Sequence, residues 1–244
     1  MAEGKAMVGS EGMGSGGISN VGVLDLTGMK STEELAGIRS ISQVGVVLVP
    51  ESLMSGFLAL PMEKVGATVP VPTGENVRLV TGQMKTTGEA LGSAGREEDV
   101  LVVAGQLLVT TPVEHVGYGE IIVAGQVYAP EGSEGALTAV ISRLTGQVFY
   151  YSGKPRFFVG SERFGGGFFE VLEGPMAMIL VGDFTIERGV PAELLKEKVS
   201  QILLAGNLQA PQELLPLVQV LTVEKAGNLS ALGEGDEGEE RAEP

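Results

Sequence analysis

Cysteine and tryptophan are absent from this sequence of 244 residues, which also has a single histidine and only 8 Phe and 4 Tyr. Without cysteine the chain cannot form disulfides, zinc–thiolate sites or a cysteine nucleophile. Because large rings are few, while 43% of the residues are apolar and 37 are glycine, the core must consist of aliphatic side chains and closely packed backbone. A core of this kind suits thin, repetitive structures.

Basic residues are also scarce, since 16 Lys and Arg stand against 31 Asp and Glu and give a net charge of −15. A nucleic-acid partner is therefore not expected, because phosphate binding needs a clustered basic surface. No uncharged apolar run reaches the roughly 18 residues that cross a membrane, and the N-terminal segment lacks the apolar stretch of a signal peptide. The sequence predicts a cytoplasmic protein without membrane insertion.

A short apolar phrase centred on glycine recurs along the chain, as in LVVAGQLLV (101–109), IIVAGQVYA (121–129) and ILLAGNLQA (202–210). Most gaps between successive glycines of this kind are 20 to 24 residues, and two are shorter, 16 and 14. Repeats with such a period indicate a solenoid. The anchoring glycines are Gly22, Gly45, Gly66, Gly82, Gly105, Gly125, Gly146, Gly160, Gly182, Gly206 and Gly227.

Segments with helical spacing lie between several phrases, at 135–144, 191–201 and 211–221. A strand, a turn and a short helix cannot bury their apolar face alone, so neighbouring units must stack. The predicted fold is therefore an α/β or mainly β solenoid. It would have about ten stacked coils of 20–24 residues with parallel strands, in a single domain over 18–232.

A polar residue, usually an amide, follows many of the anchoring glycines. In stacked coils such residues lie above one another and form a ladder, in the interior or along a turn, in which each side chain satisfies its neighbour's hydrogen bonds. If the ladder is buried, Asn207→Leu or Gln126→Leu should destabilise the fold by roughly 1 to 3 kcal/mol. The predicted ladder consists of Gln83, Gln106, Gln126, Gln147, Asp183, Asn207 and Asn228.

The segments VSQILLAGN (199–207) and YGEIIVAGQ (118–126) match the L-x-x-L-x-L-x-x-N pattern. The chain thus resembles a leucine-rich-repeat-like solenoid, which implies strands along one face, often concave, and binding of proteins there or on loops. Lys225 and Gln43 depart from the pattern by occupying apolar positions. A straighter parallel β-helix with helical inserts, as in polymer-forming bacterial scaffold proteins such as bactofilins, is the alternative.

The two ends of the chain lack periodicity. Residues 1–17 are rich in Gly and Met, and the acidic segment 233–244 cannot pack a core. Both are predicted to be disordered. The polar stretch 86–99 interrupts the repeat and is predicted to be a protruding loop.

No catalytic, cofactor-binding or metal-binding residue is expected. Gly12, Gly14 and Gly17 spell G-x-G-x-x-G, but no strand precedes them, as the dinucleotide fingerprint requires. His115 follows TTPVE (110–114) in a connection between repeats and is predicted to be an exposed loop side chain. The acidic run at 97–99 lacks the spacing of a calcium loop.

Eight of the 12 aromatic residues fall between 149 and 169, with arginines among them. This composition is typical of an interface hot spot, because consecutive aromatic residues on a strand point to opposite faces. A locally thicker core explains the cluster equally well. The candidate interface residues are Phe149, Tyr150, Tyr151, Arg156, Phe157, Phe158, Arg163, Phe164, Phe168 and Phe169.

These features predict a non-catalytic structural scaffold or protein-binding solenoid, whose partner is another protein or a second copy of itself. The open strand edges at the ends of a solenoid favour self-association into a homo-oligomer. The alternative is a β-helix enzyme that acts on a polysaccharide, because spatial neighbours one coil apart can form a carboxylate pair.

Overall fold

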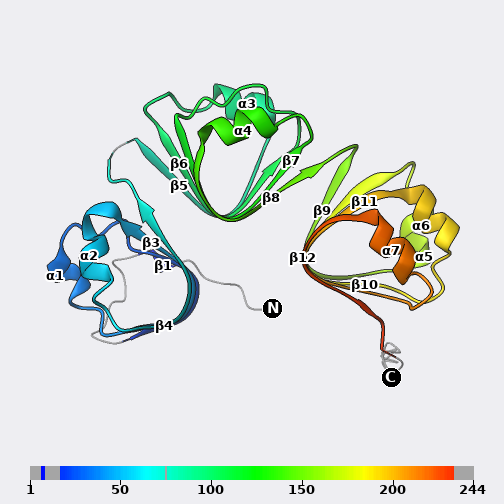
Figure 1. Ribbon diagram of the computed structural model, residues 1–244, viewed down its shortest axis with the longest axis horizontal. Helices are drawn as coiled ribbons and strands as arrows, with labels where there is room; N and C mark the ends of the chain where they lie inside the picture. The colour runs from blue at the N-terminus through cyan, green and yellow to red at the C-terminus, as the bar shows by residue number, and fades with distance from the viewer. Residues whose placement is uncertain (1–6, 9–16, 75, 234–244) are drawn as a thin grey trace, which may run out of the picture. The chain divides into compact units, whose positions relative to one another are not determined.

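The computed structural model of the protein describes residues 7–8, 17–74 and 76–233. Their strands form three four-stranded sheets of parallel strands with short helices between them (Figure 1). The contacts divide the chain into two compact units, Met1–Tyr150 and Tyr151–Pro244. The predicted parallel, mainly β architecture with short helices is therefore confirmed. A single stack of all the coils is not shown, because the strands pair only within three separate sheets of four strands.

The first sheet belongs to the first unit and has the order β1-β2-β3-β4. Short helical segments connect its longer strands. The strands are β1 (Met7–Val8), β2 (Ile18–Asp25), β3 (Ile41–Pro50) and β4 (Met62–Val71), and the helices are α1 (Thr32–Leu35), η1 (Glu51–Leu53) and α2 (Met54–Phe57).

The second sheet, also in the first unit, has the order β5-β6-β7-β8. Its strands are β5 (Val77–Thr86), β6 (Val100–Val109), β7 (Glu120–Pro130) and β8 (Ile141–Tyr151), and its helices are α3 (Gly88–Ser93) and α4 (Glu134–Val140).

The third sheet forms the second unit and has the order β12-β11-β10-β9. Its strands are β9 (Pro155–Phe164), β10 (Met176–Ile186), β11 (Val199–Ala210) and β12 (Thr222–Ala231), and its helices are α5 (Gly166–Glu170), α6 (Ala192–Lys198) and α7 (Leu215–Leu221).

Each long strand bends near its middle, so that every sheet is folded into two arms with helices across the open side (Figure 1). In the second and third sheets the bend falls at the anchoring glycines, which pair in register and have positive φ. Glycine adopts this conformation without the strain that a Cβ imposes. The repeat read from the sequence therefore gives the true register of these sheets.

The first sheet bends by a different device. Asn20, Gln43 and Lys64 have φ values of 58°, 53° and 55°, in the left-handed region. Each stands two residues before an anchoring glycine, and the strand pairing passes over these three residues and the glycines without a shift of register. Neighbouring strands therefore carry a left-handed residue at the same register position. The departure of Gln43 from the repeat pattern marks this position.

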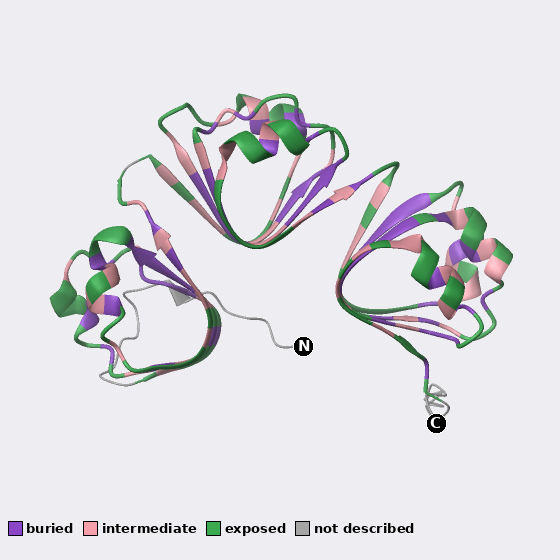
Figure 2. Ribbon diagram, in the orientation of Figure 1, coloured by how far each residue is buried: buried purple, intermediate pink, exposed green. Residues whose placement is uncertain are grey.

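The core of each sheet lies between its two arms and under its helices. Figure 2 shows buried residues along the strands of every sheet. In β6, for example, the side chains at 101, 103, 107 and 109 join the inner core together with Leu91 of α3 and Leu137 of α4. Alternate residues point to opposite faces of a strand. The outer face of β6 therefore carries the intervening residues.

Part of the outer face is also buried within the first unit. Outer residues of the first and second sheets join one apolar cluster. Arg143 of β8 adds an ion pair to Glu51 at 2.7 Å and donates a hydrogen bond to the Pro70 carbonyl at 2.9 Å. The members of the cluster are Leu48, Val69, Val71, Val102, Ala104, Ile122 and Ala124.

Helices occupy all three segments in which helical spacing predicts them, as α4, α6 and α7. The predicted protruding loop at 86–99 contains α3, whose N-terminus is capped by Thr87: its Oγ1 accepts a hydrogen bond from the Ala90 amide at 3.0 Å. α3 contains two glycines, Gly88 and Gly92, and these weaken the helical pattern of the sequence. Within the described part of the chain, no helix has the length and apolar character to cross a membrane.

Candidate functional site

The predicted ladder residues of the second sheet lie side by side. Gln83, Gln106 and Gln126 occupy the same register position on β5, β6 and β7. The Gln83 amide donates a hydrogen bond to Gln106 Oε1 at 3.3 Å. Gln147 follows the anchoring glycine of the next strand, β8. The stacking of these amides, one strand apart, follows from the glycine-on-glycine register.

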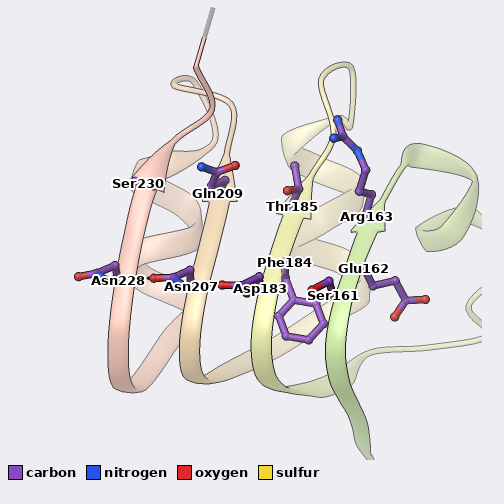
Figure 3. Close-up of a pocket in the computed structure, with 10 residues that line it drawn as sticks. All are labelled: Ser161, Glu162, Arg163, Asp183, Phe184, Thr185, Asn207, Gln209, Asn228 and Ser230. Carbon is purple, nitrogen blue, oxygen red and sulfur yellow. Dashed lines mark hydrogen bonds between the residues drawn. The ribbon is translucent and has the colours of Figure 1, made fainter. Parts of the chain in front are cut away.

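The third sheet carries the better connected ladder (Figure 3). Asp183, Asn207 and Asn228 are paired in register on β10, β11 and β12. The Asn207 amide donates to Asp183 Oδ1 at 2.7 Å, and the Asn228 amide donates to Asn207 Oδ1 at 3.3 Å. Ser161 of β9 pairs with Asp183 and completes the row. Sequence reasoning missed Ser161, although it follows an anchoring glycine like the other members.

The ladder lies on the outside of the bend, so the expectation of burial is wrong. Asp183, Asn207 and Asn228 are exposed, and Gln106 and Gln126 are half-buried. The physical reason is that side chains alternate between the two faces of a strand. The residues two before and two after each anchoring glycine line the core. The residue directly after the glycine therefore points away from the core. Water can replace a lost ladder hydrogen bond there.

We expect Asn207→Leu to lower the free energy of unfolding by less than about 1 kcal/mol, because a solvated hydrogen bond contributes little. Chemical denaturation of both proteins measures the difference. Leu208→Ala is the contrasting variant, since Leu208 is the next residue but is fully buried, and it should cost about 2–4 kcal/mol. A larger loss for Asn207→Leu than for Leu208→Ala would contradict the external position of the ladder.

A shallow polar groove of about 1000 Å³ runs along this ladder on the third sheet (Figure 3). A second row, two residues further along each strand, forms its other side, and Arg163 in that row lies 3.4 Å from Glu187. Six of the ten lining residues carry an amide or a hydroxyl group, which can donate and accept hydrogen bonds. The lining residues are Ser161, Glu162, Arg163, Asp183, Phe184, Thr185, Asn207, Gln209, Asn228 and Ser230.

Four of the eight rings in the predicted aromatic interface are core. Phe149, Tyr151, Phe164 and Phe169 are at most 1% exposed. The other four rings, at 150, 157, 158 and 168, are half-buried, whereas Arg156 and Arg163 are exposed. The rings pack on one another, as Phe164 does on Phe158 with centroids 5.0 Å apart. The alternative of a locally thicker core therefore describes the four buried rings.

Burial also shows in the acidity of the tyrosines. Desolvation raises the pKa of Tyr151 to about 12 and raises the pKa of Tyr128 as well. Tyr128 stacks on Phe149 with ring centroids 5.1 Å apart. The phenol groups, which are neutral at physiological pH in any case, therefore also stay neutral in more alkaline solution.

The other residues weighed as chemical candidates stay apart. His115 is exposed, as predicted. Glu98 and Asp99 lie near Arg96, at 3.4 and 3.8 Å, in an exposed turn. Among the described residues, no group of three or more His, Asp or Glu side chains is placed to hold a metal ion. Gly12 and Gly14 fall outside the described residues, as do most of the predicted disordered ends.

Large apolar side chains that are exposed gather at the edges of the sheets. Four of them lie on edge strands: Met62 on β4, Leu144 on β8, Val159 on β9 and Val223 on β12. The other three lie in helical segments that adjoin edge strands. These are Leu58 after α2, Val171 after α5 and Val220 in α7.

Comparisons of the chain with protein-family models, with curated proteins and with solved structures give no match.

Proposed function

We propose that the protein is a non-catalytic structural scaffold that self-associates through the open edges of its sheets. In this proposal each sheet, with the helices across its open side, acts as a short solenoid segment. The segments are of the leucine-rich-repeat-like or parallel β-helix kind that the repeat pattern resembles. The partner is then another protein, and in the first place a second copy of the chain.

The distribution of exposed apolar side chains carries the proposal. All seven large exposed apolar residues of the described chain lie on edge strands or in the helical segments next to them. An edge strand presents unpaired amide and carbonyl groups that pair readily with another chain. Apolar groups beside such an edge add to the attraction, whereas a monomeric protein normally protects its edges with charge.

The net charge of −15 opposes association at long range. Salt screens this repulsion over about 10 Å at 0.1 M, so the scaffold should assemble better at moderate than at low ionic strength. Contacts between apolar side chains and strand edges are not weakened in the same way.

Sedimentation velocity of the full chain over a range of concentrations tests the proposal. We expect the average mass to rise with protein concentration, and to rise at lower concentration in moderate salt than in low salt. Leu58→Ser and Val220→Ser, which change exposed positions next to edges, should lower the average mass. A chain that stays monomeric at every concentration and salt would exclude the scaffold.

A further inference from the structure

The third sheet can be extended by translation, because its strands repeat in one constant register. Gly160, Gly182, Gly206 and Gly227 pair in sequence from β9 to β12, with parallel strands throughout. Each strand therefore offers to its successor the same backbone groups that it accepts from its predecessor. The free edge of β12 is consequently complementary to the free edge of β9, which no strand of its own sheet pairs with.

The anchoring glycines show where a next strand would sit. A Cβ added to Gly182, Gly206 or Gly227 would lie 2.0, 2.1 or 1.8 Å from the carbonyl oxygen of the glycine on the preceding strand. Around Gly160, which also has a positive φ of 108°, the same position has no atom within 4 Å. β9 thus keeps the conformation that receives a preceding carbonyl, and Gly227 of β12 offers one.

The two edges carry opposite charges at positions that are apolar inside the sheet. Lys225 of β12 pairs in register with Leu204, and Glu162 of β9 pairs with Phe184. Leu204 and Phe184 belong to the inner core, whereas Lys225 and Glu162 are exposed. Neither charge has an ion pair or a side-chain hydrogen bond within the described residues.

A charge that points inward on an edge strand discourages indiscriminate pairing. Because Lys225 and Glu162 have opposite charges, they disfavour some pairings of edges and not others. Pairing of β12 with β12 would bring two lysines together, and pairing of β9 with β9 would bring two glutamates together. Pairing of β12 with β9 instead brings Lys225 toward Glu162. The two residues are then four register positions apart. This separation is at most about 13 Å along an extended strand, and the bend shortens it. Such a separation is comparable with the Debye length of about 10 Å at 0.1 M salt.

Apolar and polar groups also match between the two ends. Val159 and Val171 are 57% and 78% exposed at the β9 end, and Val220 and Val223 are 79% and 53% exposed at the β12 end. Within the ladder of the third sheet, the amides of Asn207 and Asn228 donate to the preceding strand. Asn228 Oδ1 is the next acceptor in this direction, and the hydroxyl of Ser161 is the donor that β9 would supply.

We infer that the second unit associates head to tail, with β12 of one chain pairing in parallel with β9 of a second copy. This inference rests on the proposed scaffold function and names its contact. The contact extends the sheet and the polar ladder without a break and covers the exposed valines. Because the two surfaces differ, each chain keeps one free end of each kind, and the assembly is an open polymer or a ring rather than a closed two-fold dimer.

Charge reversal of the full-length chain tests the inference at a fixed, moderate salt concentration. Lys225→Glu places a glutamate at both of these edge positions, and Glu162→Lys places a lysine at both, so each variant alone should associate about tenfold more weakly than its control. The controls are Lys196→Glu and Glu193→Lys, which make the same change in net charge at exposed positions of α6, in a middle coil. Sedimentation velocity measures the average mass, and circular dichroism confirms that every variant is folded.

An equimolar mixture of the two charge-reversed variants is the decisive sample. In the mixture the reversed ends attract each other and so do the unreversed ends, so the average mass should return to that of the unchanged protein. Weak association that mixing does not restore would overturn the head-to-tail contact, as would variants that associate as well as their controls. In both cases the unchanged chain still self-associates and the scaffold proposal stands, whereas an unchanged chain that remains monomeric removes both.

Discussion

Gly125→Ala is expected to lower the free energy of unfolding by more than about 3 kcal/mol, or to prevent folding altogether. Gly125 has a φ of 146°, which a residue with a Cβ rarely adopts. A Cβ at this position would also lie 1.7 Å from the carbonyl oxygen of Gly105 on the neighbouring strand. Because that oxygen belongs to the backbone of a paired strand, it can move away only if the sheet opens.

Gly82→Ala provides the matched control, since Gly82 holds the same register position on the edge strand β5. Its φ is 88°, but no atom lies within 4 Å of an added Cβ. The substitution should therefore cost only the backbone strain, about 1–2 kcal/mol. Urea denaturation compares the two variants. Equal losses would mean that backbone conformation alone, and not the close approach of the strands, requires glycine at these bends.

The register of the sheets could be predicted from the sequence because this requirement leaves a regular trace. Every glycine that anchors a repeat in the second and third sheets lies at a bend and faces the anchoring glycine of its neighbour. The two shorter gaps, from 66 to 82 and from 146 to 160, mark the ends of sheets. They fall at the connections from β4 to β5 and from β8 to β9, whose described residues contain no helix.

The exposure of the ladder could also have been anticipated from the strand period. Gln106 stands one residue from the bend and Leu107 stands two, so only one of them can face the core. Leu107 is fully buried. The recurrence of an amide suggested a buried network, because stacked amides satisfy one another, but recurrence follows equally from stacking on an outer face. The period of the repeat therefore predicts which residues pair between strands. The apolar residues next to the ladder position predict which face of the strand the ladder side chain occupies.

The candidate interaction surface was less accessible to sequence reasoning. The aromatic residues at 149–169 were the most conspicuous feature of the composition, yet Phe158, Phe164, Phe168 and Phe169 lie in or against the inner core of the third sheet. The edge residues Val159 and Val223 are unremarkable in sequence. These residues are exposed because β9 and β12 are the edge strands of the third sheet. The repeat pattern of the sequence does not mark which strands are edges.

The outer faces of the strands lead to the second large effect. Ile122→Ala is expected to lower the free energy of unfolding by about 2–4 kcal/mol, the usual cost of deleting a large aliphatic side chain from a core. Ile122 points away from the inner core of its sheet, on the face that a single stack of coils would leave to solvent. It is nevertheless fully buried, in the cluster that outer residues of the first and second sheets form together.

Gln126→Ala is the control for this prediction, because Gln126 also lies on the outer side of β7 and is only half-buried beside the bend. Its loss should change the free energy of unfolding by no more than about 0.5 kcal/mol. Thermal or urea denaturation again gives both values. If Ile122→Ala were as mild as Gln126→Ala, the outer face of β7 would be solvated and the two sheets of the first unit would not share a core. A large loss would show that the unit depends on both faces of its strands, which explains why β6 and β7 are apolar almost without interruption.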